Sequence, residues 1–382
     1  MTTTAASPLA ALELLAPRIE QTRAASAAQR RLPDELARAM AEAGLFALLV
    51  PRALGGFELD PLTAADVVEA AARIDGSAGW AVMIGAQSAW FAAFLPPPVA
   101  EQVVGRRAAT LAGVLRPGGR ATPVRGGYRV SGRWEFASGC TYADHLYGTC
   151  VVEQPAGPRE LRLVYVPSAD STILDTWRSV GLRATGSHDF TLRDVPVSDG
   201  WTLPMPVLDA APHDGPLYRD GYQNLVFVLQ AAQALGVARG SLVAFTELAA
   251  DTVRWLSGAP LRDRPMVQIT VARAEAKVAS ARAWLREAVG DVWDTITAGD
   301  PPGPRQRVQV RLAITHGIST AVGVADVLQQ VAGAAAVPED HPLQRGFQDL
   351  RTAAAHVQAA PSIFELTGGL LLGADVPPSV LL

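Results

Sequence analysis

A segment in the middle of the chain combines aromatic and hydroxyl side chains at a spacing that suits a flat ligand. Trp134 and Phe136 are two residues apart, and because side chains alternate along a strand, both are expected on one face. Ser138 follows on that face, at a corner formed by Gly139. An aromatic wall beside a hydroxyl and a backbone N–H would suit a planar heterocycle. The spacing alone favours the alternative, a hydrophobic barrel core that ends in a turn serine.

His356 is the second candidate for chemistry. On a helix, Asp349, Thr352 and His356 would share one stripe, with Arg345 four residues before Asp349. A neutral imidazole near pH 7 can accept a proton or donate a hydrogen bond. The stripe therefore indicates either a buried site or a solvent face, in which case the histidine caps a helix or lies in an interface.

The remaining titratable residues narrow the chemistry. The six histidines lack the spacing of a metal site, so no metal is expected. Cys140 and Cys150 are too few for a disulfide framework or a zinc cluster, which favours a reducing cytoplasm. Lys277 is the single lysine, which weakens any mechanism that needs a lysine nucleophile. His188 is interpreted as a turn residue.

Composition excludes several functional classes. The chain has 382 residues, of which 49% are hydrophobic, so we expect a large folded core. Its formal net charge of −4 argues against nucleic acid as a partner. The longest apolar stretches are interrupted by Arg, Gln or Gly, so no membrane span is expected.

Three regions that differ in their sequence patterns must position these residues. Residues 1–107 read as helical, residues 108–210 as short strands of an antiparallel barrel, and residues 211–382 as a bundle of long helices. In the first region, Asp60 and Pro61 form a helix start, and residues 77–95 are apolar all round, as in a buried helix. In the third, helices are expected over 225–248, 265–297 and 308–334, with shorter ones on either side of Pro361.

Four segments, in the same order, resemble the acyl-CoA dehydrogenase superfamily. They are residues 127–139, 32–56, 175–189 and 341–356, and they are most similar to the hydroxylase branch of two-component flavin-dependent monooxygenases. This branch includes oxygenases that act on hydroxyphenylacetate, steroid-derived phenols and dibenzothiophene. The resemblance implies an N-terminal helical domain, a β-barrel and a C-terminal four-helix bundle.

The resemblance also implies cofactor contacts. Ser138 would lie by flavin N5, and Trp134 would pack on the isoalloxazine within the wall that includes Phe136. Thr185, Gly186 and Ser187 would bind the ring edge or the ribityl chain. Arg262 would reach the flavin phosphates of a neighbouring subunit, as a planar guanidinium can; a solvated loop arginine is the alternative.

On the substrate side, the resemblance places His356 across the flavin from Ser138. There His356 could deprotonate a phenol or orient the oxygen species. Some relatives carry a second histidine on the third N-terminal helix; this chain has none there, so Gln87, Ser88 or Trp90 is expected to line the pocket. His145, just beyond the flavin corner, is a further candidate for contact with substrate.

The implied function is that of an oxygenase component. Reduced FMN or FAD would arrive from a separate reductase, O2 would form a C4a-hydroperoxyflavin, and an aromatic or natural-product substrate would be hydroxylated. No strand–Gly-x-Gly-x-x-Gly–helix fingerprint is present, so no nicotinamide site is evident. A homotetramer is expected from the family and from the small residues on the bundle helices.

Two alternatives remain open. A dehydrogenase or desaturase would pass hydride to oxidised flavin and would need a carboxylate base over the ring, for which Glu365 is the C-terminal candidate. A flavin-free binding or assembly protein would use the fold without chemistry.

Overall fold

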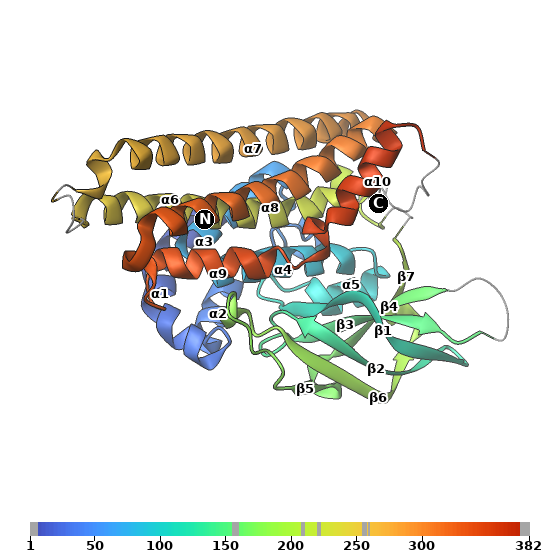
Figure 1. The fold of residues 1–382 in the computed structure, drawn as a ribbon. Coiled ribbons are helices and arrows are strands. Elements are labelled where there is room, and N and C mark those ends of the chain that lie inside the picture. Colours follow the sequence, from blue (N-terminus) through green and yellow to red (C-terminus); the bar gives the residue numbers. More distant parts are fainter. Residues whose placement is uncertain are drawn as a thin grey trace, which may run out of the picture.

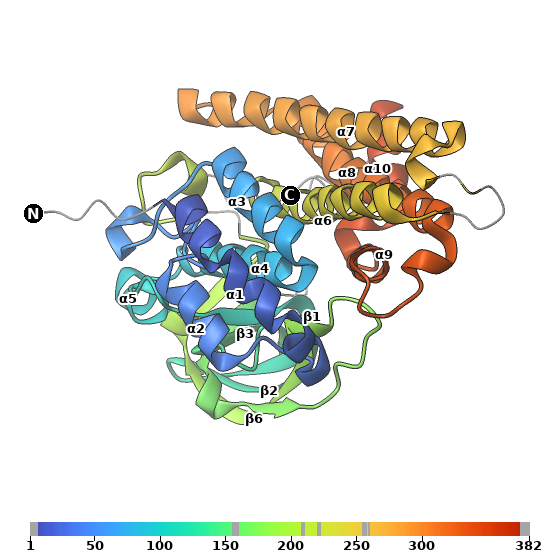
Figure 2. The same cartoon turned by 90° about the vertical axis from the view of Figure 1, so that its left-hand side faces the viewer.

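The structure is a computed structural model that describes residues 7–154, 160–207, 211–219, 223–253, 258 and 260–374. Helices come before and after a single sheet along the chain (Figure 1). The sheet lies at one end of the molecule, and α7 (Pro265–Ala298) lies on the side farthest from it (Figures 1 and 2). The expected order of helices, strands and helices is therefore confirmed.

The N-terminal helices begin where the sequence signals predict. They are α1 (Pro8–Gln29), α2 (Asp34–Glu42), α3 (Pro61–Ile74), α4 (Gly76–Ala92) and α5 (Pro97–Val104). Asp60 caps α3, because its carboxylate accepts the N–H groups of Leu62 and Thr63. Helix α4 is buried along nearly its whole length, as its all-round apolar sequence predicts.

The sheet has seven strands in the order β5-β6-β2-β1-β3-β4-β7. The strands are β1 (Leu111–Val124), β2 (Gly127–Ala137), β3 (His145–Val152), β4 (Leu161–Pro167), β5 (Thr172–Leu174), β6 (His188–Ser198) and β7 (Thr202–Met205). The prediction of a purely antiparallel sheet is wrong for one pair, because β1 and β3 are parallel. The chain reverses direction before β2 and again before β3, so β3 runs in the same direction as β1 along its other edge.

The prediction that Trp134 and Phe136 share a face of β2 is wrong. The pairing of β2 with β6 shifts between Trp134 and Ala137, and Phe136 has a φ of +67°. This irregularity breaks the alternation of side chains. As a result Trp134 is 1% exposed and stacks on Phe190 inside the sheet's own core, with ring centroids 4.9 Å apart, whereas Phe136 is 63% exposed.

Glycines create the space for Trp134. A Cβ atom at Gly119 would lie 2.3 Å from the Trp134 ring, and one at Gly148 would lie 2.4 Å from it. The indole N–H donates to the Thr149 carbonyl at 2.9 Å. Trp134 is therefore a packing residue, and the structure offers no face of its ring to an isoalloxazine.

The C-terminal helices are α6 (Asn224–Asp251), α7, α8 (Pro304–Ala332), α9 (Pro342–Ala353) and α10 (Pro361–Leu371). One hydrophobic core runs through both helical regions, and α3 packs closely on α6. By length and composition α6 could cross a membrane, contrary to the sequence expectation, but 83% of its most apolar window is buried inside the protein. This burial identifies α6 as a core helix.

Candidate active site

A chain of hydroxyl groups joins the end of β2 to the turn before β6. Ser138 Oγ lies 2.7 Å from Ser187 Oγ, which lies 2.6 Å from Thr185 Oγ1. Thr185 Oγ1 in turn donates to the Leu182 carbonyl at 2.9 Å. All three hydroxyl residues are buried. The structure therefore brings together Ser138, Thr185 and Ser187, which the sequence placed in two separate segments.

Trp80 of α4 completes this cluster, although sequence reasoning did not select it. Its indole N–H donates to Ser138 Oγ at 3.0 Å. Its ring also meets the His356 ring edge to face, with centroids 5.9 Å apart. In the sequence Trp80 looks like one more apolar residue of a buried helix, and only the polar edge of its indole distinguishes it.

His356 lies near the cluster but not on a helix, so the predicted helical stripe is wrong. Helix α9 ends at Ala353, and His356 caps the short 3-10 helix Val357–Ala359. Its Nδ1 accepts the N–H of Gln358 at 3.3 Å. The turn after α9 therefore aims the imidazole at Trp80, a direction that helical spacing alone cannot give.

Burial keeps His356 neutral. Loss of hydration lowers the pKa of its imidazole to about 4, so it carries one proton at neutral pH. Because Nδ1 accepts a hydrogen bond, that proton is on Nε2. The amide nitrogen of Gln230 in α6 lies 3.4 Å from His356 Nε2. The amide oxygen of Gln230, Oε1, is buried and has no hydrogen-bond partner. Rotation of this amide by 180° would let its oxygen accept the Nε2 proton.

The turn before β6 is held at several points. His188 Nδ1 accepts the N–H groups of Thr176 and Trp177, both at 3.1 Å, so its side chain has a structural role, although His188 is the first residue of β6 and not a turn residue. Asp349 of α9 accepts the N–H of Leu182 at 2.5 Å. Leu182 has a φ of +49°, and Gly186 also adopts the left-handed conformation, with a φ of +57°. Gly186 suits this conformation because it has no Cβ.

These residues fit a flavin ring. Phe136 offers an exposed aromatic face, flanked edge to face by Trp177 with ring centroids 6.3 Å apart. Thr141 Oγ1 is buried without a hydrogen-bond partner, next to Gly186. The combination of an exposed ring, an unsatisfied hydroxyl and a hydroxyl cluster provides both the stacking and the polar contacts that an isoalloxazine needs.

Other predicted site residues lie elsewhere. Gln87 donates to the Val226 carbonyl at 2.8 Å and so links α4 to α6. Trp90 donates to the Leu217 carbonyl at 3.1 Å and so links α4 to the 3-10 helix Pro216–Tyr218. His145 begins β3 and packs against Trp201, with ring centroids 5.7 Å apart. These contacts favour packing over substrate binding for all three residues.

Arg262 and Glu365 are exposed to solvent. Arg262 lies in the 3-10 helix Leu261–Asp263 between α6 and α7, at the end of the bundle far from the sheet (Figure 1). Arg262 could therefore reach a flavin only on another copy of the chain. Glu365 lies on the exposed face of α10. Among the residues that the structure describes, no group of His, Cys, Asp and Glu could hold a metal ion.

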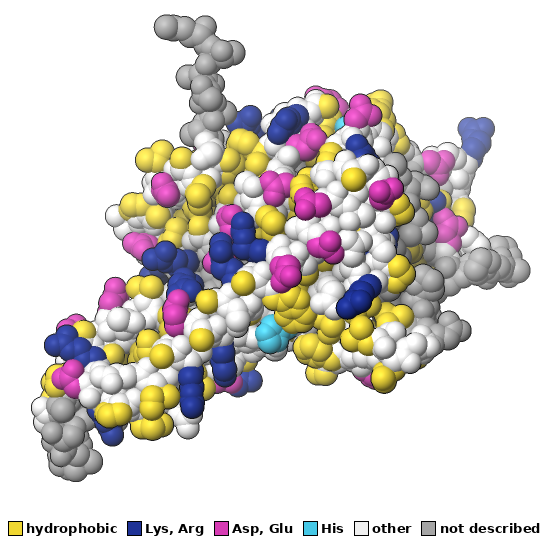
Figure 3. Space-filling view, turned by 90° about the horizontal axis from the view of Figure 1, so that it is seen from above, with side chains coloured by type: hydrophobic (Ala, Val, Ile, Leu, Met, Phe, Trp, Pro, Cys, Tyr) yellow, Lys and Arg dark blue, Asp and Glu magenta, His cyan; other side chains and the backbone are white. Residues whose placement is uncertain are grey.

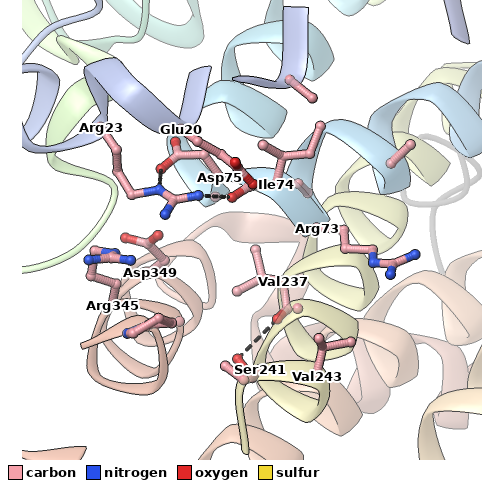
Figure 4. A pocket seen from close by; sticks show the side chains of 18 of the residues that line it. Glu20, Arg23, Arg73, Ile74, Asp75, Val237, Ser241, Val243, Arg345 and Asp349 are labelled. Carbon is pink, nitrogen blue, oxygen red and sulfur yellow. Dashed lines mark hydrogen bonds and ion pairs between the residues drawn. The ribbon is translucent and has the colours of Figure 1, made fainter. Parts of the chain in front are cut away.

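A cavity of about 590 Å³ lies beside α1, between α6 and α9. Its lining includes Asp349, which faces it with Arg345, while Arg23 pairs with Asp75 at 3.3 Å on its upper edge (Figure 4). Neither the hydroxyl cluster nor His356 lines this space. The cavity therefore borders the active site only through Asp349.

Comparison with known proteins supports the resemblance. The family descriptions "Acyl-CoA dehydrogenase, N-terminal domain" and "Acyl-CoA dehydrogenase, C-terminal domain" match residues 6–95 and 228–361. The chain is 32% identical to the indole-3-acetate monooxygenase of Pseudomonas putida, over 92% of this chain and 90% of that protein. It is 28% identical to a flavin-dependent monooxygenase oxygenase subunit, HsaA, of Mycobacterium tuberculosis, over 94% and 93% of the two chains.

A solved structure agrees with these relatives. XiaF from Streptomyces sp., in complex with FADH2 and glycerol, superposes with a TM-score of 0.91 and 26% identity, over 97% of this chain and 96% of that one. The similarity thus extends over nearly the whole fold.

Proposed function

Because the chain belongs to the acyl-CoA dehydrogenase superfamily, in its branch of flavin-dependent monooxygenase oxygenase components, we propose that it hydroxylates an aromatic substrate at the cluster described above. The observation that supports this site is the set of contacts that joins Ser138, Trp80 and His356. It brings a neutral hydroxyl, an indole and a neutral imidazole together, and Phe136, whose ring is exposed, accepts the backbone N–H of Ser138 with its carbonyl.

Bound reduced flavin would supply the electrons that activate O2. In this proposal Phe136 stacks on the isoalloxazine, and Ser138, Thr185 and Ser187 bind its polar edge. Gly186 allows the backbone to approach closely. Trp134, which the sequence nominated for stacking, supports this wall from inside the sheet.

His356 acts as a hydrogen-bond donor in this proposal. A group with a pKa of about 4 is a weak base at pH 7, so it would be ineffective in deprotonating a phenol, whose pKa resembles that of tyrosine, about 10. With substrate bound, its Nε2 proton can donate to an oxygen atom of the substrate or of the oxygen species in place of Gln230, and so orient that atom. Of the two roles that the sequence left open, the structure favours orientation.

The partners follow from the family. The relatives named as oxygenase subunits imply a separate reductase, and we propose that a diffusing reductase product supplies FMNH2 or FADH2 to this chain. Cys140 and Cys150 are both free and buried, which is compatible with the proposed location in a reducing cytoplasm.

We also propose that the chain assembles as a homotetramer. The face that carries α7 mixes apolar side chains with basic and acidic ones (Figure 3). Met266 and Ile269 of α7 are 68% and 43% exposed, and Phe364, Leu371 and Leu372 near the C-terminal end are exposed as well. Association would cover these residues and could bring Arg262 to a neighbouring flavin.

The dehydrogenase alternative has less support. It needs a carboxylate above the flavin, and Glu365 points to solvent from α10. The flavin-free alternative is disfavoured by the intact hydroxyl cluster and the exposed Phe136.

A turnover experiment tests the proposed function. The protein, a generic flavin reductase, NADH and indole-3-acetate or a simple phenol are incubated under ¹⁸O2. The product should carry one ¹⁸O atom per molecule, and none should form without the reductase. Anaerobic bleaching of oxidised flavin by the substrate would instead identify a dehydrogenase.

A further inference from the structure

The hydroxyl cluster has a direction that can be deduced by counting hydrogens. The Leu182 carbonyl can only accept, so Thr185 uses its single hydroxyl hydrogen there. Thr185 must then accept from Ser187, and Ser187 from Ser138. At the other end the indole N–H of Trp80 can only donate, and it donates to Ser138. Every hydrogen bond therefore runs from Trp80 towards Leu182.

This direction determines what Ser138 can offer a ligand. Its hydrogen is engaged by Ser187, and one lone pair takes the Trp80 hydrogen. One lone pair remains, so Ser138 presents an acceptor and no donor to a flavin. We propose that Trp80, Ser187 and Thr185 act as specificity-determining residues that make this site select reduced over oxidised flavin. This inference rests on the proposed function, in which the flavin lies against Ser138.

The chemistry of the ring explains the selection. The central ring of a reduced isoalloxazine carries N–H donors, whereas the oxidised ring presents bare nitrogen acceptors. A donor facing Ser138 completes the hydrogen-bond chain. An acceptor facing Ser138 leaves two buried lone pairs opposed, which is unfavourable because neither group can then bond to water.

Both ends of the chain resist reversal. Leu182 is held by Asp349 through its N–H and by the Trp177 indole, which donates to the Leu182 carbonyl at 3.2 Å. Trp80 lies on the buried helix α4. Reversal would break the hydrogen bond from Thr185 to Leu182. Loss of one such bond would make the reversed orientation about fivefold less populated than the observed one.

Variants at Ser187 test the inference through binding. The dissociation constants of oxidised and dithionite-reduced FMN and FAD are measured anaerobically by ultrafiltration. Wild-type protein should bind the reduced forms more tightly. In Ser187→Ala the Ser138 hydrogen has no inner partner and can point outward, so oxidised flavin should bind more tightly. The ratio of the dissociation constant of oxidised flavin to that of reduced flavin should fall about fivefold.

Companion variants separate this effect from general damage. Thr185→Val should lower the ratio as Ser187→Ala does, while Thr185→Ser keeps the hydroxyl and should retain the wild-type ratio. Ser138→Ala should weaken binding of reduced flavin without a gain for oxidised flavin. Thr149→Val is the matched control, since Thr149 Oγ1 is buried, has no hydrogen-bond partner and does not belong to the hydroxyl cluster; its ratio should equal that of wild type.

The outcomes distinguish the two levels of the proposal. Equal affinities for both redox forms in the wild type, or an unchanged ratio in folded Ser187→Ala, would overturn the inference and leave the proposed function standing. Failure of the wild type to bind flavin in either form would overturn the proposed function, and this inference with it.

Discussion

The barrel-side and helix-side walls of the active site differ in whether their charge can change near pH 7. The barrel side presents the hydroxyls of Ser138, Ser187 and Thr185, which do not ionise near neutral pH. The helix side contains His356 and, in α9, Asp349, both of which ionise in water. Burial lowers the pKa of His356 to about 4 and raises that of Asp349 to about 7.

This difference shows which wall responds to pH. The barrel side is neutral because hydroxyl groups do not ionise near pH 7. Its interaction with a ligand therefore depends only on which hydroxyls donate and which accept hydrogen bonds. Neutrality on the helix side depends on burial and on the charged groups around the cavity, namely Arg23, Asp75 and Arg345 (Figure 4). Of the residues on the two walls, Asp349 is therefore the one whose substitution should have a pH-dependent effect near neutral pH.

The largest effect is expected from Trp134 and Phe136, the two aromatic residues near the end of β2. Trp134→Ala should reduce the free energy of unfolding by about 3–5 kcal/mol, because it leaves a cavity in the sheet core. Phe136→Ala should change it by about 0.5 kcal/mol or less, yet weaken flavin binding up to about tenfold. Urea titration and flavin binding measure the two quantities. Equal destabilisation by both substitutions would contradict the assigned faces.

The next largest effect concerns Asp349. Its pKa is about 7 in the folded protein and 3.8 in an exposed carboxyl, so the folded state holds the proton more tightly between these values. The contribution to stability is full below pH 3.8 and is lost as pH rises to 7. The decline is about 1.4 kcal/mol per pH unit.

Asp349→Asn should remove this slope. Urea titrations at several pH values between 4 and 8 give the difference in unfolding free energy between the variant and wild type. Asp326→Asn is the control, because Asp326 pairs with Arg351 near the surface. A difference between Asp349→Asn and wild type that does not change with pH would show that the carboxyl is ionised throughout.

A smaller effect is expected from His356→Ala. Loss of an oriented donor should lower the product formed per O2 consumed by about tenfold, which corresponds to about 1.4 kcal/mol. Since the wild-type imidazole is neutral above pH 4, the product yield should not change between pH 6 and 8. His316→Ala provides a matched control on α8. A wild-type inflection near pH 6.5 that the His356 variant lacks would contradict the neutral assignment.

The smallest effect on the reaction is expected from Ser138→Ala. Its unfolding free energy should fall by about 1–2 kcal/mol, because two buried hydrogen bonds are lost, one from Trp80 and one to Ser187. H2O2 release per reduced flavin oxidised should rise a few-fold, equally at pH 6 and pH 8, because no ionisable group is removed. Unchanged H2O2 release would remove Ser138 from the oxygen chemistry.

Much of the fold could be predicted because local signals carry it. Asp60 with Pro61 starts α3, Pro265 starts α7, and the apolar composition of α4 indicates burial. The parallel pairing of β1 with β3 could not be predicted, because it depends on where a strand returns in space. The short strand β7 is paired to β4 and has no distinct pattern.

The site was predicted in part for similar reasons. Ser138, Thr185 and Ser187 follow from the family pattern, but their direct contacts require the folded turn. Strand periodicity failed at Phe136, because a single left-handed residue reversed its face. Helical periodicity failed at His356, because α9 ends three residues earlier. Trp80 was missed because nothing in a buried apolar helix distinguishes one tryptophan from its neighbours.

The close packing of α3 on α6 affects how the chain is made. A Cβ atom at Gly236 would lie 2.3 Å from the Glu69 carbonyl, so the two helices fit together almost without side chains between them. All seven strands are synthesised between these partners. A ribosome that adds about 5–20 residues per second leaves the apolar side of α3 uncovered for many seconds. Newborn chains would thus be substrates for chaperones until α6 emerges, and truncations before Asn224 should be degraded.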